Sequence, residues 1–268
     1  MVMGRFDFIE CAASGYRFLM VEHALVGRMM LLPLAVKLVS FVFITALDLD
    51  QNYLRQGLIL IPSFFAEGWL VAQLVRLAIF RESWPTMLSG DRKKDMEVLH
   101  VRFRAITSAT IIYVLLKLAT SLLAGLALEA NSSYQGPENP EPSSLAFLVG
   151  MLAMMFMIWA FRFLWLYIPT ALDYPIKDFL YRIRSFRSSV LMIATWLLTF
   201  TPVALLFVMI SEFMVSVFPP VEEGVVPETY QYAMVCVQAV LELLMAIVTS
   251  LGIAYLIALY YQNDGKAK

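Results

Sequence analysis

Five ionisable residues lie inside otherwise apolar stretches of this 268-residue sequence and are its strongest candidates for chemistry. They are Lys37, Glu67, Lys117, Arg162 and Glu242. A charge at membrane depth is costly, so such residues usually have a partner or line a functional pathway. Counted at about 1.5 Å per residue from expected helix ends at Phe80 and Ala105, Glu67 and Lys117 lie at the same depth. This predicts an ion pair between them, because pairing partly offsets the cost of burying either charge.

The other three residues are expected at different depths in the membrane. We expect Lys37 and Arg162 nearer the inner membrane face and Glu242 nearer the outer face. One interpretation of the five charges is a polar pathway for protons, an ion or a lipid headgroup. The favoured interpretation is a structural pair that fixes helix register, with Lys37 and Arg162 extending toward the interface.

No other group of residues has the spacing of a catalytic or metal site. His23 and His100 have no Cys, His or carboxylate neighbours at metal-ligand spacing. Four methionines between positions 151 and 157 are typical of a packed apolar helix and do not require a soft metal. The sequence contains no Gly-rich phosphate loop, nucleophile elbow or zinc-protease motif. We therefore expect a protein that is not an enzyme and holds no cofactor or metal.

The elements that position these charges are apolar helices. Hydrophobic residues make up 60% of the chain and charged residues 15%, against about 25% charged in soluble domains. A helix needs about 20 apolar residues to cross a bilayer. Six stretches qualify: Met29 to Leu47, Gly57 to Phe80, Ala105 to Leu128, Leu145 to Ala171, Val190 to Phe218 and Tyr230 to Tyr261. The sequence predicts one all-α membrane domain over residues 1–268.

The distribution of Lys and Arg predicts the orientation. The connections after the second and fourth spans are basic and are expected in the cytoplasm, as are both termini. The other three connections are acidic and are expected outside. Nine basic residues on the inner side are candidates for contact with lipid headgroups or a partner surface: Arg92, Lys93, Lys94, Arg102, Arg104, Lys177, Arg182, Arg184 and Arg187.

Amphipathic segments precede the first, third and fifth spans on the expected cytoplasmic side. In the first, Phe8, Ile9, Ala12, Tyr16, Leu19 and Met20 share an apolar face. In the second, Met96, Leu99, Phe103 and Ile106 do so, and in the third Ile176, Phe179, Leu180, Ile183 and Phe186, after Pro175. We interpret all three as interfacial helices. The chain then divides into three hairpin units, 5–80, 92–171 and 175–261.

Two stretches resemble a known family. One is Gly68-Trp69-Leu70-Val71-Ala72-Gln73-Leu74-Val75-Arg76, running to Phe80-Arg81-Glu82; the other is Trp159-Ala160-Phe161-Arg162 through Tyr167-Ile168-Pro169, followed by residues 178–187. Over about a third of the chain they resemble bacterial membrane-domain-like proteins related to the transmembrane region of glycerophosphoryl diester phosphodiesterases. The resemblance implies a six-helix bacterial inner-membrane protein without a catalytic part, because hydrolysis in those phosphodiesterases belongs to a separate soluble domain.

Together these observations predict a non-enzymatic integral inner-membrane protein, a component or accessory subunit that binds other membrane proteins or lipids. The alternative is a small transporter or channel with a polar pathway at Glu67 and Lys117. The expected partners are the bilayer, anionic lipids at the cytoplasmic face, and a membrane protein or a second copy of the chain. A net charge of -1 gives no reason to expect nucleic acid.

Overall fold

The computed structural model describes residues 7–47, 49, 53–82, 90–133, 144–218 and 227–265. Within these ranges the chain forms α helices and one short 3-10 helix, and no strand. Six stretches are long and apolar enough to cross a membrane: His23–Ala46, Arg55–Phe80, Arg92–Leu126, Met154–Ala171, Phe186–Val217 and Glu228–Gln262. The protein is therefore all-helical with six candidate spans, as the sequence predicts.

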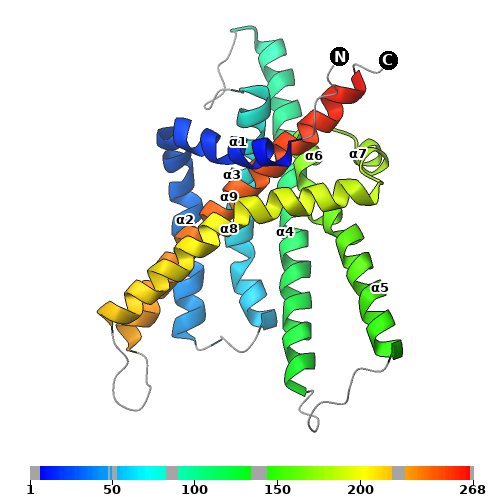
Figure 1. The fold of residues 1–268 in the computed structure, drawn as a ribbon. Coiled ribbons are helices and arrows are strands. Elements are labelled where there is room, and N and C mark those ends of the chain that lie inside the picture. The colour runs from blue at the N-terminus through cyan, green and yellow to red at the C-terminus, as the bar shows by residue number, and fades with distance from the viewer. Residues whose placement is uncertain are drawn as a thin grey trace.

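The helices are α1 (Phe8–Val21), α2 (His23–Ala46), α3 (Tyr53–Phe80), α4 (Arg92–Ser133), α5 (Ser144–Ala160), η1 (Phe161–Trp165), α6 (Tyr167–Ala171), α7 (Ile176–Arg182), α8 (Phe186–Val217) and α9 (Glu228–Gly265). At one end of the bundle α3 ends at Phe80 and α4 begins at Arg92 (Figure 1). We call this the terminal end, because α1 begins and α9 ends there as well (Figure 1). The helix α9 is central and packs against α1, α2, α3, α6 and α8.

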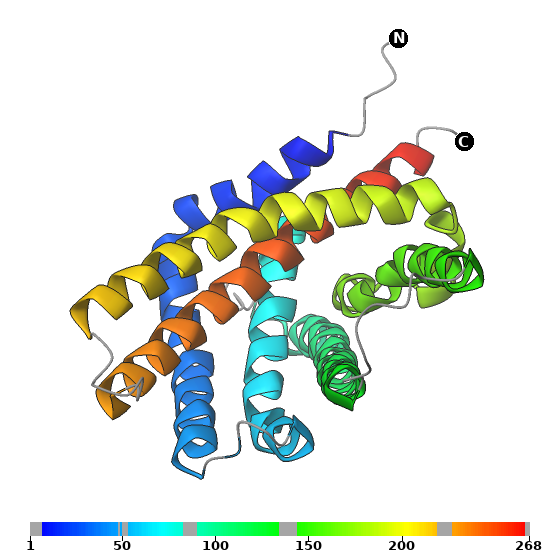
Figure 2. The ribbon, with the colours of Figure 1, turned by 60° about the horizontal axis from the view of Figure 1, so that its bottom comes forward.

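A layer of α1, α8 and α9 lies over α2 and α3 (Figure 2). Small residues allow the close crossing of these helices. A Cβ atom on Gly15 would lie 2.9 Å from the carbonyl oxygen of Val248, and one on Gly252 would lie 2.8 Å from the Thr199 methyl group. The Tyr16 hydroxyl donates to the Thr199 carbonyl oxygen at 2.6 Å across the same junction.

The first amphipathic segment forms α1, but its buried face differs from the expected apolar face. Cys11, Ala12 and Gly15 are buried, whereas Ile9 and Met20 are exposed. The reason is the close approach to α9, which accepts only small side chains at the crossing. Tertiary packing of small residues therefore decides which face turns inward.

The second amphipathic segment is not a separate helix. Residues 92–106 form the first turns of α4, which runs from Arg92 to Ser133 without a break. No Gly or Pro occurs between Arg92 and Ala124, so nothing in the sequence ends the helix before the span. The prediction of an interfacial helix at this position is wrong, and the second unit of the expected repeat lacks its introducing helix.

The fourth span is broken near its terminal end. The expected single helix from Leu145 to Ala171 is divided into α5, η1 and α6. Pro169 explains the break, because a proline cannot donate to the carbonyl four residues earlier and its ring clashes with it. That carbonyl belongs to Trp165, where the 3-10 segment ends. The third amphipathic segment follows as α7, seven residues long, with Pro175 at its N-cap.

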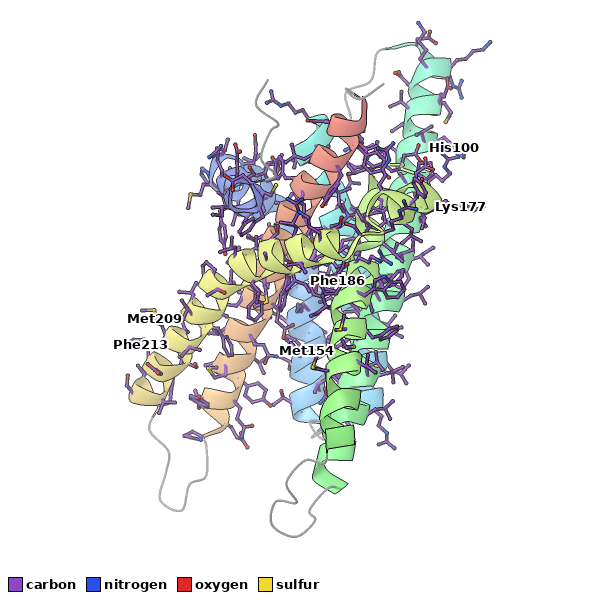
Figure 3. All side chains as sticks on the ribbon, turned by 45° about the vertical axis from the view of Figure 1, so that its right-hand side comes forward. His100, Met154, Lys177, Phe186, Met209 and Phe213 are labelled. Carbon is purple, nitrogen blue, oxygen red and sulfur yellow. The ribbon has the colours of Figure 1, made fainter. Side chains whose placement is uncertain are left out.

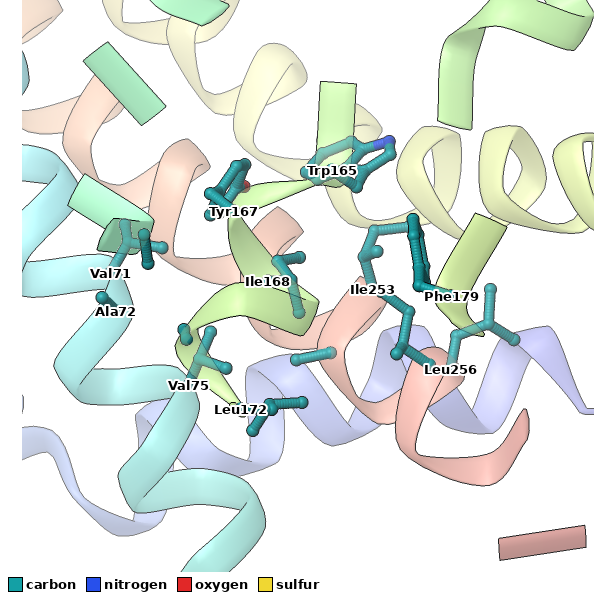
Figure 4. Close-up of a cluster of buried hydrophobic side chains, with 14 of the residues drawn as sticks. Val71, Ala72, Val75, Trp165, Tyr167, Ile168, Leu172, Phe179, Ile253 and Leu256 are labelled. Carbon is teal, nitrogen blue, oxygen red and sulfur yellow. The ribbon is translucent and has the colours of Figure 1, made fainter. Parts of the chain in front are cut away.

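A hydrophobic core joins the terminal half of the bundle. Figure 4 shows Val71 and Val75 of α3, Ile168 of α6, Phe179 of α7 and Ile253 of α9 meeting in one cluster. Away from this core the helices expose apolar side chains. Met154 on α5 and Met209 and Phe213 on α8 are each more than half exposed, far from the terminal end where His100 and Lys177 lie (Figure 3).

Candidate functional site: a charge network inside the bundle

Charged side chains from four candidate spans meet inside the bundle. Lys37 Nζ on α2 lies 2.8 Å from Glu67 Oε2 on α3 and 2.9 Å from Glu242 Oε2 on α9. Lys117 Nζ on α4 lies 3.3 Å from Glu67 Oε1. The order Lys117, Glu67, Lys37, Glu242 alternates in sign, so each charge faces an opposite one. These four residues, the charge network below, carry no net charge together.

Neutral groups complete the charge network. The Tyr113 hydroxyl on α4 donates a hydrogen bond to Glu67 Oε1, and Lys117 Nζ lies 5.5 Å from the centre of the Tyr113 ring. Gln238 Nε2 donates to Glu242 Oε1 at 2.8 Å. Such partners supply the hydrogen bonds that a buried carboxylate needs beyond its ion pair. The network therefore has the satisfied geometry that makes buried charges tolerable.

A second hydroxyl pair extends this polar region toward α6. The rings of Tyr113 and Tyr167 pack edge to face with centroids 4.9 Å apart. The Tyr167 and Ser250 hydroxyl groups lie 2.8 Å from each other. These contacts connect α4, α6 and α9 beside the charged groups, and all three side chains are buried.

Burial differs sharply along the network. The side chains of Glu67 and Lys37 are 1% and 2% exposed, whereas those of Lys117 and Glu242 are 38% and 41% exposed. The inner pair therefore depends on its partners, because a charge left alone in such a place costs several kcal/mol, about 3–5. The two outer charges reach the side surface of the bundle from α4 and α9.

The predicted pair of Glu67 and Lys117 is present, but the expected depths of Lys37 and Glu242 are wrong. The helix α2 begins at His23, not at Met29, which places Lys37 14 residues from the helix start. Glu67 is 13 residues from Phe80, where α3 ends, so the two share a depth. The tilt of α9 brings Glu242 to the same group (Figure 1).

Tyr113 and Gln238 were not among the residues predicted from the sequence. Each stands four residues before a charged member of the network, Tyr113 before Lys117 and Gln238 before Glu242. Residues four apart share a helix face, so this spacing is a usable signal. Tyr167 carries no comparable signal, because only the break before α6 turns it inward.

Arg162 does not belong to this network. Its Nη1 donates to the carbonyl oxygen of Ile183 at 2.8 Å, and its guanidinium lies 4.3 Å from the centre of the Trp159 ring. Arg162 is 5% exposed, because protein groups surround it on the side of α7. Its expected extension to the membrane interface stays a prediction. Ile183 caps the C-terminus of α7, where a cation is favourably placed. The role of Arg162 visible here is to hold that helix end.

A second cluster lies at the terminal end, and we call Arg76, Glu82 and Arg102 the arginine cluster. Arg76 donates from Nε to Glu82 Oε2 at 2.9 Å and pairs through Nη2 with Oε1. Arg102 Nε lies 3.3 Å from Glu82 Oε2, and its Nη2 donates to Gln73 Oε1 at 3.1 Å. Both arginines are about 95% buried. Arg102 was predicted as a headgroup contact, but Arg76 was not predicted as a site residue.

The other predicted basic residues are mostly exposed at the terminal end. Arg92, Lys93, Lys94, Arg104, Lys177, Arg184 and Arg187 are exposed, and Arg182 is half-buried. Lys94 Nζ lies 3.8 Å from Asp91 Oδ2, and Arg104 Nη2 lies 3.3 Å from Asp173 Oδ1. Arg182 lies over the Tyr261 ring at 4.5 Å. Exposed carboxylates lie here as well, at Asp91, Glu97, Asp173 and Asp178. The exposed basic side chains outnumber them, so this end of the molecule presents a surface with an excess of positive charge.

The fold and these clusters define an all-helical protein with six candidate spans and paired charges inside its bundle. Comparison with known protein families, curated proteins and solved structures finds no match to this chain in any of the three. In the part of the chain that the structure describes, no group of three or more His, Cys, Asp or Glu residues could hold a metal ion.

Proposed function

We propose that this protein is a non-enzymatic integral membrane protein whose basic end binds anionic lipids and membrane-protein partners. The observation that carries the proposal is the exposed basic surface at the terminal end, beside helices that present apolar side chains outward. The proposed location is a bacterial inner membrane with the terminal end in the cytoplasm, following the excess of Lys and Arg there. The resemblance to the transmembrane region of the phosphodiesterases supports the same proposal.

The physical basis is attraction between the basic surface and an anionic leaflet. Each Lys or Arg near such a surface contributes about 1 kcal/mol of binding free energy, within a Debye length of the lipid headgroups. Long basic side chains can also lay their apolar stems along a helix and place the charge at the headgroups. Exposed residues such as Arg92, Lys93, Arg184 and Arg187 suit this arrangement.

Native mass spectrometry of the detergent-solubilised protein tests the proposal. After incubation with equal amounts of phosphatidylglycerol and phosphatidylcholine of identical chains, we expect preferential retention of phosphatidylglycerol. Replacement of Arg184 and Arg187 by Gln removes two exposed charges and should reduce the number of retained anionic lipids. Equal retention of the two lipids by the unchanged protein, with no co-purified protein, would contradict the proposed function.

A small transporter or channel is the second candidate, and one observation favours it. Lys37 and Glu67 form a charged pair buried within two candidate spans, and ionisable residues at such positions are typical of proton and ion pathways. Proton or ion flux into proteoliposomes that disappears in Glu67→Gln, with the fold retained, would support transport. A flux equal to that of empty liposomes for the unchanged protein would count against it.

A further inference from the structure

A cavity between α3 and α4 opens on the side of the bundle near the terminal end. Its volume is about 380 Å³, within the range of small-molecule sites. The wall is formed mainly by aromatic and aliphatic side chains, with a few polar groups. The lining residues are Phe65, Trp69, Gln73, Leu99, Arg102, Phe103, Ile106, Thr107 and Thr110. Phe103 and Thr107 are exposed at its rim, so the cavity faces the surroundings of the bundle laterally.

The cavity has the length of one leaflet. Along α4 its wall extends from Leu99 to Thr110, which at about 1.5 Å per residue is about 16 Å. The hydrocarbon core of a bilayer is about 30 Å thick, so the cavity spans about half of it. The part of the cavity around Phe65 and Thr110 lies toward the middle of α3 and α4. Its other part, around Gln73 and Arg102, lies toward the terminal end.

Charge at the terminal end of the cavity favours an anion. Arg102 lines the cavity and belongs to the arginine cluster, in which two guanidinium groups share the one carboxylate of Glu82. The three side chains therefore carry one positive charge in excess. Arg76 and Arg102 are both buried, which strengthens their attraction for a negative group compared with an exposed lysine.

We propose that this cavity is a specific site for an anionic phospholipid, with one acyl chain between α3 and α4 and the phosphate beside Arg102. Guanidinium groups bind phosphate oxygens with directed hydrogen bonds, and the Gln73 amide, which contacts Arg102, adds a polar group at the same level. The aromatic rings of Trp69 and Phe103 cover the chain. The inference rests on the proposed lipid-binding function and adds to it a location and a headgroup preference.

The test uses two variants of the full chain. Arg102→Gln removes the cavity charge and keeps a hydrogen-bonding group. Arg28→Gln is the matched control, because it makes the same change at an exposed position of α2, outside the cavity and outside the basic residues assigned to the lipid-binding surface. Binding of palmitoyl-oleoyl phosphatidylglycerol is measured by native mass spectrometry. We expect Arg102→Gln to weaken binding of the tightest-bound lipid at least about tenfold and Arg28→Gln to change it less than about threefold.

A second pair of variants tests the acyl-chain position without changing charge. Thr107→Phe fills the rim of the cavity, whereas Ile111→Phe adds the same ring at an exposed position of α4 outside it. We expect only Thr107→Phe to lower occupancy. Thermal unfolding without added lipid checks that each variant is folded, and this second pair decides the result if Arg102→Gln does not fold.

The outcomes separate this inference from the proposed function. If Arg102→Gln and Thr107→Phe bind the lipid like their controls while phosphatidylglycerol is still preferred, the cavity site is wrong and the function stands. If phosphatidylcholine binds the unchanged protein as tightly as phosphatidylglycerol, the cavity site is wrong, and the proposed function fails with it when no protein co-purifies. Loss of the tightest-bound phosphatidylglycerol in the cavity variants alone supports the site.

Discussion

Replacing Glu67 with Gln should destabilise the protein far more than the same change at Glu242. Glu67 is buried and contacts Lys37, Lys117 and Tyr113. With Gln at this position, Glu242 is the one carboxylate left in the charge network, and it contacts Lys37 but not Lys117. Removing one partner of a buried pair costs about 3–5 kcal/mol. In this variant Lys37 keeps its contact with Glu242 at 2.9 Å, and Lys117 is partly exposed. We therefore expect a loss of unfolding free energy at the lower end of that range, about 3 kcal/mol.

Glu242→Gln serves as the matched control. The side chain of Glu242 is 41% exposed, and Lys37 would keep its contact with Glu67. Ion pairs with an exposed partner contribute about 0.2–1 kcal/mol, so the expected loss is about 1 kcal/mol or less. The free energy of unfolding of both variants is measured by reversible titration from mild detergent into sodium dodecyl sulfate, followed by circular dichroism.

A double variant tests whether the cost arises from the charge left behind. In Lys37→Met with Glu67→Gln the most buried ammonium group is also removed. We expect the combined loss to be smaller than the sum of the single losses by about 1–3 kcal/mol, because the two residues share one interaction. Strict additivity, or a loss below about 1 kcal/mol for Glu67→Gln alone, would refute the reasoning that the network stabilises this bundle.

Two further predictions concern the layer of α1, α8 and α9. Gly252→Ala should lower the free energy of unfolding by about 1–3 kcal/mol in the same titration, because the added Cβ would meet the Thr199 methyl at 2.8 Å. Gly27 has open space around it, so Gly27→Ala should be neutral or stabilising. Equal effects of the two variants would contradict the close helix crossing. Burial, with Glu10 and Asp7 nearby, raises the pKa of the Cys11 thiol to about 11. Only the thiolate reacts, so the rate of maleimide labelling of Cys11 should rise about tenfold per pH unit up to that pKa. Labelling of Cys11 should be slower than labelling of the exposed Cys236. Rapid labelling of Cys11 at pH 7 would refute this prediction.

The sequence contains enough information for the spans and for one buried pair, because apolar length and charged helix ends are local properties. Glu67 and Lys117 could be paired by counting from those ends. Lys37 could not, since its depth depends on α2 starting at His23. The position of Glu242 depends on the tilt of α9, which is set by its packing on α1 and α8. Tilt arises from contacts between distant segments and leaves little trace in one helix.

Helix boundaries show the same division between local and tertiary causes. Pro175 marks the start of α7 in the sequence and in the structure. The segment before the third span is helical, as predicted, but sequence periodicity alone does not show whether a helix ends before the next begins. The arginine cluster was missed as a unit, because it joins Arg76 of α3 to Arg102 of α4 through Glu82, which follows the end of α3.

The unbroken helix α4 has a mechanical consequence. Its 42 residues correspond to about 63 Å, twice the thickness of a bilayer core. The same rod carries Arg102 beside the cavity and Lys117 in the charge network. A rigid lever converts a small lateral displacement at one end into a rotation of its whole length. A lateral force on the first turns of α4, near Lys94, would therefore move Lys117 relative to Glu67. Spin labels on α3 and α4 would report that movement as a change in the distance between them.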